Sequence, residues 1–169
     1  GAISFFDTSI WIEAILFTAT SISFGPLLAY IMLMMDENDG FTALKIVLAV
    51  TLMTGFIGYG DFYSFSENSL FGYILLISLF GLIVFNFARL FMQISRPKVR
   101  VSAIFGAVLF SLFLLYDFDY LEKQSQLGNN TWSNAVDIAF ILYLDIINLL
   151  LEICLLYTSD AADELRCVV

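Results

Sequence analysis

Hydrophobic residues occur along this chain in five long runs, at residues 10–35, 41–60, 69–94, 101–118 and 135–153. The hydrocarbon core of a bilayer is about 30 Å thick, and an α-helix crosses it in about 20 residues at a rise of about 1.5 Å per residue. A backbone group left unpaired in lipid costs several kcal/mol. An α-helix pairs its backbone groups within the segment itself, so we expect each spanning segment to be a helix. The pattern predicts five membrane-spanning α-helices.

Short polar segments separate the five runs. Residues 36–40 read Asp-Glu-Asn-Asp-Gly and end the first run, and residues 60–68 separate the second run from the third. Pro97 lies between the third and fourth runs, where a proline excludes a continuous helix. The longest connector extends from Asp119 to Asn134 and contains Gly128. We expect an all-α bundle of these five spans.

Two glycine-containing features bear on the geometry of the helices. Gly25 and Pro26 lie inside the first run, where the proline removes a backbone donor and should kink the helix. The kink is either an ordinary membrane proline or a hinge that lines a pathway. Gly55 and Gly58 lie in the second run, where small residues would let another helix approach closely.

Composition agrees with a membrane protein. The chain is 60% hydrophobic and 14% charged, whereas a soluble domain is about 45–50% apolar and about 25% charged. Lipid must therefore solvate part of its surface, and we expect an integral, multi-pass protein whose particular membrane stays open. The net charge of −9 makes nucleic acid an unsuitable partner, since nucleic-acid binding depends on basic residues. The same negative charge favours a cation as the partner.

The two ends of the chain have unusual sequences. The chain opens at Gly1 rather than at a methionine, and hydrophobic sequence follows almost at once. Residues 154–164, Cys-Leu-Leu-Tyr-Thr-Ser-Asp-Ala-Ala-Asp-Glu, resemble one reading frame of a sequencing-library transposon adaptor. We therefore expect residues 154–169 to be a non-native tail, and residues 1–153 to form the transmembrane bundle.

Ionisable residues within a membrane span are costly and mark candidate functional sites. The last run contains Asp137, Asp145 and Glu152, together with Asn148. At about 100° per residue, Asp145 and Glu152 lie about 20° apart on a helix, and Asn148 and Asp137 lie within about 80° of them. The predicted helix therefore has one acidic, polar face that should point into the bundle. Asp117 ends the preceding run and adds another carboxyl group.

Two carboxyl groups in a bundle of low dielectric constant cannot both ionise without compensation. They either share a proton or are neutralised by a cation. Both outcomes predict proton-coupled handling of a hard cation such as Ca²⁺, which takes oxygen ligands. The alternative is a purely structural ion pair between one of these acidic residues and Lys45 or Arg89.

Several motifs resemble the Bax inhibitor family, also called the transmembrane Bax inhibitor motif proteins. Val108-Leu-Phe-Ser-Leu-Phe-Leu-Leu-Tyr-Asp117 and Ile141-Leu-Tyr-Leu-Asp-Ile-Ile-Asn-Leu149 are similar to the last two helices of that family. Three shorter pieces are similar to earlier family helices: Phe24-Gly-Pro-Leu-Leu28, Gly58-Tyr-Gly-Asp61 and Phe85-Asn86. The resemblance covers residues 15–153.

The resemblance implies a fold and a function. The family has seven helices with the last one central, so five of an expected seven are present here. It implies a pH-sensitive calcium leak with a role in restraining cell death, no enzymatic activity, and no cofactor other than Ca²⁺ and protons as permeant or regulatory ions. By resemblance, Asp117 and Asp145 are the paired proton and calcium sensor. The family topology places the Asp119–Asn134 loop in the cytoplasm, whereas the basic cluster at residues 96–100 favours the opposite orientation.

Two other functions fit some of the same residues. Gly58-Tyr-Gly-Asp61 and Tyr116-Asp117 match motifs of presenilin-type intramembrane aspartyl proteases, in which two carboxyl groups sharing a proton activate water. The motifs occur here in the reverse order along the chain. A proton-coupled transporter could use the same acidic face, although inverted repeats, which are common in transporters, are not evident.

Overall fold

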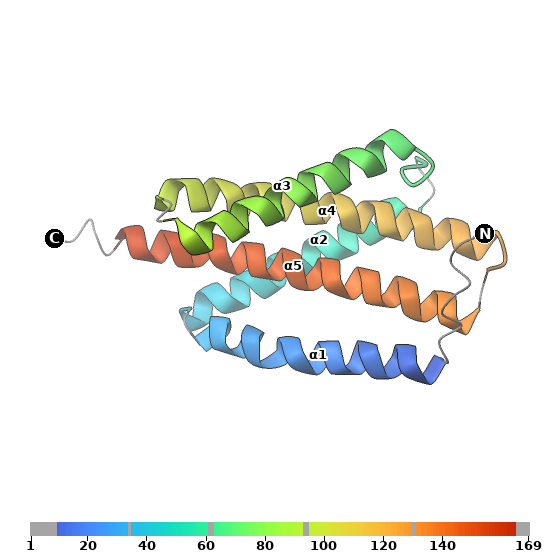
Figure 1. Cartoon of the computed structure of the whole chain (residues 1–169), viewed down its shortest axis with the longest axis horizontal. Coiled ribbons are helices and arrows are strands. Elements are labelled where there is room, and N and C mark those ends of the chain that lie inside the picture. The colour runs from blue at the N-terminus through green and yellow to red at the C-terminus, as the bar shows by residue number, and fades with distance from the viewer. Residues whose placement is uncertain (1–9, 34, 61–62, 93–94, 130, 165–169) are drawn as a thin grey trace.

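A computed structural model describes residues 10–33, 35–60, 63–92, 95–129 and 131–164. These residues form five α-helices and no strand: α1 (Ile10–Leu33), α2 (Glu37–Tyr59), α3 (Ser69–Phe91), α4 (Arg96–Gln126) and α5 (Trp132–Glu164). Each helix is long and apolar enough to cross a membrane. All five extend roughly along the long axis of the molecule (Figure 1). The predicted all-α bundle of five spans is confirmed.

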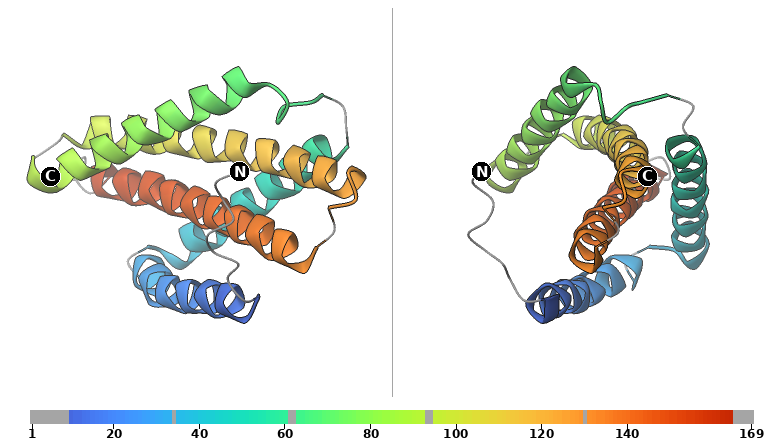
Figure 2. Two further views of the ribbon diagram at one scale, coloured as in Figure 1. Left: turned by 45° about the vertical axis from the view of Figure 1, so that its right-hand side comes forward. Right: turned by 90° about the vertical axis from the view of Figure 1, so that its right-hand side faces the viewer.

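Helix α5 occupies the centre of the bundle. It packs against α1, α2 and α4, and α4 in turn packs against α2 and α3. In the view along the helices, α5 lies inside the arc formed by the other four (Figure 2, right). The bundle buries 44% of the membrane-spanning part of α5, compared with 28% for α4 and 17% or less for the other helices. The expected central position of the last helix agrees with this packing.

The core is apolar and so is the outer surface. Leu75, Leu114 and Leu149, from α3, α4 and α5, are almost completely buried in the same cluster. On the outside, large apolar side chains such as Phe56 and Phe80 are 73% and 69% exposed. A soluble monomer rarely exposes contiguous apolar patches of this kind, so the outer surface is suited to lipid.

Helix α2 begins earlier than the sequence pattern predicted. We expected residues 36–40 to form a connector, but the helix starts at Glu37 and the backbone N–H of Gly40 already donates to the Asp36 carbonyl. The acidic residues Glu37 and Asp39 lie in its first turn. Negative charge is favourable there because a helix N-terminus carries partial positive charge. The polar residues therefore start the helix instead of interrupting it.

Helix α4 is longer at both ends than the predicted span of residues 101–118. Pro97 lies in its first turn, where a proline is tolerated because that N–H has no helical partner. At the other end the helix continues to Gln126. Gly128 ends it with φ 73°, and the N–H of Asn129 donates to the Gln124 carbonyl in a Schellman motif. The predicted connector 119–134 is thus reduced to a short turn around Gly128.

Helix α5 extends beyond the predicted span at residues 135–153. It begins at Trp132 and continues to Glu164, through the segment that resembles an adaptor. Cys154, the first residue of that segment, is 1% exposed and belongs to the apolar core. The boundary at residue 153 is therefore not a structural one. The origin of residues 154–169 stays a prediction.

Candidate functional site: a buried acidic pair beside a cavity

Asp117 of α4 and Asp145 of α5 meet in the interior. Each residue is only 8% exposed, and their side chains lie within hydrogen-bond reach of each other. Since an ionised carboxylate only accepts hydrogen bonds, this contact needs a shared proton or a cation between the oxygens. Among the described residues, one buried oxygen of each carboxyl group, Oδ2, has no hydrogen-bond partner.

The pair borders a cavity of about 520 Å³ between α3, α4 and α5. Helix α3 packs against α4 but makes no close backbone approach to α5 within the described chain, and the cavity occupies this space. Its polar lining comes from Tyr116, Asp117, Asp145, Asn148, Glu152 and Asn86. Leucine, isoleucine and phenylalanine side chains form most of the remaining wall. The polar lining therefore includes residues of all three helices.

The regular spacing of α5 produces this polar lining. Asp145, Asn148 and Glu152 are three and four residues apart, so they lie along one face of the helix, and all three border the cavity. Asp137 departs from the expectation that it shares this buried face, because its side chain is exposed. It lies two turns before Asp145 and about 80° away around the helix. The buried polar face therefore begins at Asp145.

Glu152 has an electrostatic partner on α3. It is 8% exposed, its side chain lies within hydrogen-bond reach of Asn86, and it interacts electrostatically with Arg89. Arg89 is one of the two basic residues considered for a structural ion pair. The other, Lys45, is exposed on α2, with its ammonium group 6.0 Å from the ring centroid of Phe41.

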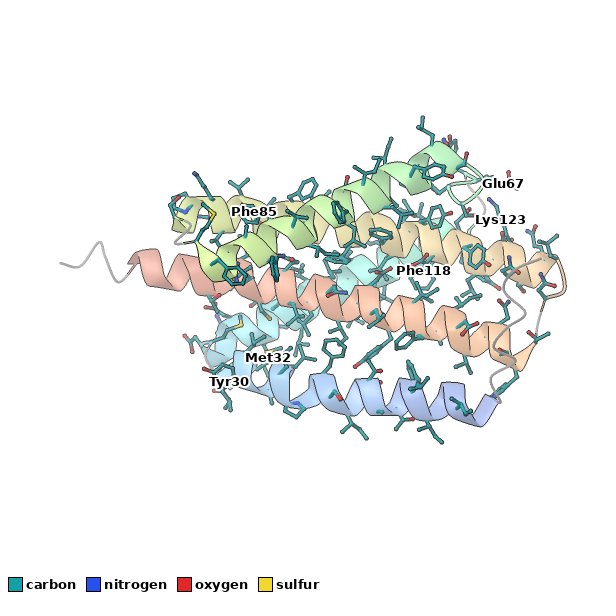
Figure 3. All side chains as sticks on the ribbon, in the orientation of Figure 1. Tyr30, Met32, Glu67, Phe85, Phe118 and Lys123 are labelled. Carbon is teal, nitrogen blue, oxygen red and sulfur yellow. The ribbon has the colours of Figure 1, made fainter. Side chains whose placement is uncertain are left out.

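The carboxylate of Asp119 is also buried, which the sequence pattern did not predict. Asp119 is 0% exposed, and its Oδ2 accepts hydrogen bonds from the Ser66 backbone N–H at 2.7 Å and from Lys123 Nζ at 3.0 Å. Lys123 Nζ also lies 3.8 Å from Glu67 Oε1, and the two side chains meet at one end of the bundle (Figure 3). The spacing of four residues between Asp119 and Lys123 was the available signal. The charged residues around it instead predict a connector.

Two other expectations concern the hinge at Gly25 and Pro26 and the motif at residues 58–61. Gly25 and Pro26 are exposed, and α1 continues as a helix through Pro26, so the hinge stays a prediction. Asp61, the second acidic residue of the protease hypothesis, lies outside the described residues. Gly58 of the same motif packs against α4: a Cβ there would come 2.8 Å from the Leu115 carbonyl oxygen. This gives Gly58 a role in helix packing.

Five helices able to span a membrane, with a buried acidic pair between two of them, define a multi-pass membrane protein. A sequence model of the family described as "Inhibitor of apoptosis-promoting Bax1" matches residues 3–161. The chain belongs to this Bax inhibitor family. The match extends past residue 153 and so includes the first part of the predicted tail.

Several plant proteins are similar to this chain. "BI1-like protein" of Arabidopsis thaliana is 32% identical over 116 residues, which cover 64% of this chain and 43% of that protein. "Protein LIFEGUARD 4" of Arabidopsis thaliana is 28% identical over 115 residues, covering 68% of this chain and 42% of that protein. The chain thus spans less than half the length of the curated relatives it matches.

Proposed function

We propose that this protein is a pH-sensitive calcium leak channel of the Bax inhibitor type, in which the Asp117–Asp145 pair is the gate. The observation that carries the proposal is the contact between these two buried carboxyl groups at the wall of a cavity. When the pair shares a proton, it joins α4 to α5. When the proton leaves, the two negative charges either repel each other or hold a cation.

The chemistry of the site suits Ca²⁺ as the permeant or regulatory ion. Carboxylate and amide oxygens are the ligands that Ca²⁺ takes in proteins. Asp117 and Asp145 would supply carboxylate oxygens, and Asn148, one turn after Asp145, would supply an amide carbonyl. Protons and Ca²⁺ then compete for the same oxygens, so flux should depend on pH. In this proposal the protein binds and passes ions without transforming a substrate.

The proposal is tested by calcium flux through the full-length protein in liposomes. Purified protein is reconstituted with a fluorescent Ca²⁺ indicator inside the vesicles, and the initial rate is measured between about pH 5 and 8. We expect pH-dependent flux that falls at least about tenfold in Asp145→Asn and in Asp117→Asn. Asp137→Asn removes a carboxylate from the same helix at an exposed position and should keep the rate of the unmodified protein.

Other results would favour a different function. Saturable uptake of one solute, driven by a proton gradient, would indicate a transporter that uses the same acidic face. Cleavage of a membrane peptide that is lost in Asp61→Asn would indicate an aspartyl protease. The family description names inhibition of apoptosis, and we propose that role here only as a consequence of the calcium leak. Asp145→Asn should therefore abolish any protection of cells together with the flux.

A further inference from the structure

A second cavity adjoins the acidic one along α5. It has a volume of about 730 Å³ and lies between α1, α3 and α5. The two cavities share four wall residues: Ile83, Asn86, Asn148 and Glu152. On α3 their combined wall extends from Gly72 to Arg89, which is about 25 Å along a helix axis. The combined wall is thus nearly as long as the hydrocarbon core is thick, about 30 Å.

Glu152 lies at the junction of the two cavities. Its backbone is on α5, but α4 limits where its carboxyl group can go, because a Cβ at Gly106 would come 2.6 Å from Glu152 Cδ. The side chain of Asn86 holds it from the α3 side. Glu152 is more than nine-tenths buried, and its Oε2 has no hydrogen-bond partner in the part of the chain that the structure describes.

Arg89 lies one turn after Asn86 on α3 and lines the second cavity. It attracts Glu152 electrostatically. Its Nη1 is nevertheless buried and has no hydrogen-bond partner among the described residues. Two opposite charges with unsatisfied atoms thus face one junction. Because a buried polar atom without a hydrogen-bond partner is costly, a further ligand that contacts either atom would be favoured.

We propose that Glu152 and Arg89 form a second gate on the calcium route, an inference that rests on the function proposed above. The guanidinium group of Arg89 compensates Glu152 and repels an entering cation. A Ca²⁺ ion at the junction would instead find the Glu152 carboxylate and the amide oxygens of Asn86 and Asn148. Passage requires the ion to replace Arg89 as the partner of Glu152, so this pair limits the rate of the leak.

The test uses the same flux measurement on the full-length protein. Arg89→Gln removes the repelling charge and should raise the initial Ca²⁺ rate at least about threefold. Glu152→Gln removes the attracting charge and should lower the rate at least about threefold. Lys98→Gln neutralises an exposed basic residue at the start of α4 and should leave the rate unchanged.

If Arg89→Gln does not fold, Gly106→Ala tests the same proposal without changing any charge. Gly106→Ala places a methyl group against the Glu152 carboxyl group and should push it toward α3 and Arg89, lowering the flux. Gly81→Ala is the matched control, because a Cβ at Gly81 has nothing within 4 Å among the described residues.

The two proposals fail in distinguishable ways. Flux that is lost in Asp145→Asn but unchanged in Glu152→Gln, Gly106→Ala and Arg89→Gln would overturn the second gate and leave the first. The absence of any Asp145-dependent flux would overturn both.

Discussion

Asp117 and Asp119, two buried residues of α4, differ in the groups that surround their carboxyl groups. Asp119 receives a backbone N–H from Ser66 and an ammonium group from Lys123, so its charge has fixed partners. Asp117, half a turn earlier, faces Asp145, another carboxyl group. A paired carboxylate at the end of a bundle stabilises the fold, whereas a pair of carboxyl groups needs an exchangeable proton or cation. We therefore assign a structural role to Asp119 and keep the functional proposal for Asp117.

At this scale, Lys123→Met is expected to destabilise the protein. The substitution keeps the length of the side chain but leaves the carboxylate of Asp119 buried without its cation. The expected loss in the free energy of unfolding is about 3 kcal/mol, the lower end for breaking a buried pair, because the network lies near the end of the helices. Thermal unfolding in detergent measures it. Glu67→Gln is the control: its side chain is 73% exposed, so its loss should stay below about 1 kcal/mol. Equal losses would contradict the structural role.

Helices α2 and α4 approach each other closely at Gly58. A Cβ at this position would lie 2.8 Å from both the Leu115 carbonyl oxygen and Phe118 Cβ, and 3.0 Å from the Asp119 backbone nitrogen. Two of these three atoms belong to the backbone, which cannot rotate away. The sequence predicted a close approach at Gly55 or Gly58. It is closest at Gly58, since Gly55 faces the flexible edge of the Phe118 ring at 3.4 Å.

At the scale of the helices, Gly58→Ala should force α2 and α4 apart. Overpacking of this kind costs about 1–3 kcal/mol, which should lower the midpoint of thermal unfolding in detergent. Gly81→Ala adds the same methyl group on α3 where the described structure leaves space. Because alanine favours a helix over glycine, that control should be neutral or slightly stabilising. If both variants unfold at the same temperature, the close approach of α2 and α4 at Gly58 does not contribute to the free energy of unfolding.

The whole molecule is a bundle in which successive helices alternate in direction. The contact between Lys123 and Glu67 brings the end of α4 next to the loop between α2 and α3. The start of α4 lies at the other end of the bundle (Figure 1). Each end of α4 should therefore lie on a different side of the membrane.

Labelling of single cysteines checks this topology. In a variant in which Cys154 and Cys167 are replaced by serine, Glu67→Cys and Asn129→Cys should react with an impermeant maleimide from the same side of the membrane. Ser95→Cys should react from the other side. By the resemblance to the family, we expect Asn129→Cys to be the cytoplasmic position. Labelling of Ser95→Cys and Asn129→Cys from one side would contradict the five crossings.

The hydrophobic runs alone determined that the chain forms five membrane helices, because only a helix of about 20 apolar residues satisfies its backbone in lipid. The order of Asp145, Asn148 and Glu152 on one face followed equally from the helical repeat. Neither feature depends on which helices touch. The resemblance to a family added the pairing of Asp117 with Asp145, which no local pattern could give, since the two residues lie on different helices.

Only the tertiary structure decided where the polar residues at the helix ends belong. The charges of Asp119 and Lys123 predict a loop because they interrupt an apolar run. In the structure Asp119 Oδ2 accepts hydrogen bonds from Ser66 and Lys123, and α4 continues past both residues. The junction at Glu152 likewise depends on Gly106 of α4 and on Asn86 and Arg89 of α3. A residue's sequence neighbours determine its helix, but the partners of a buried charge come from other helices, and their positions are fixed only when the bundle packs.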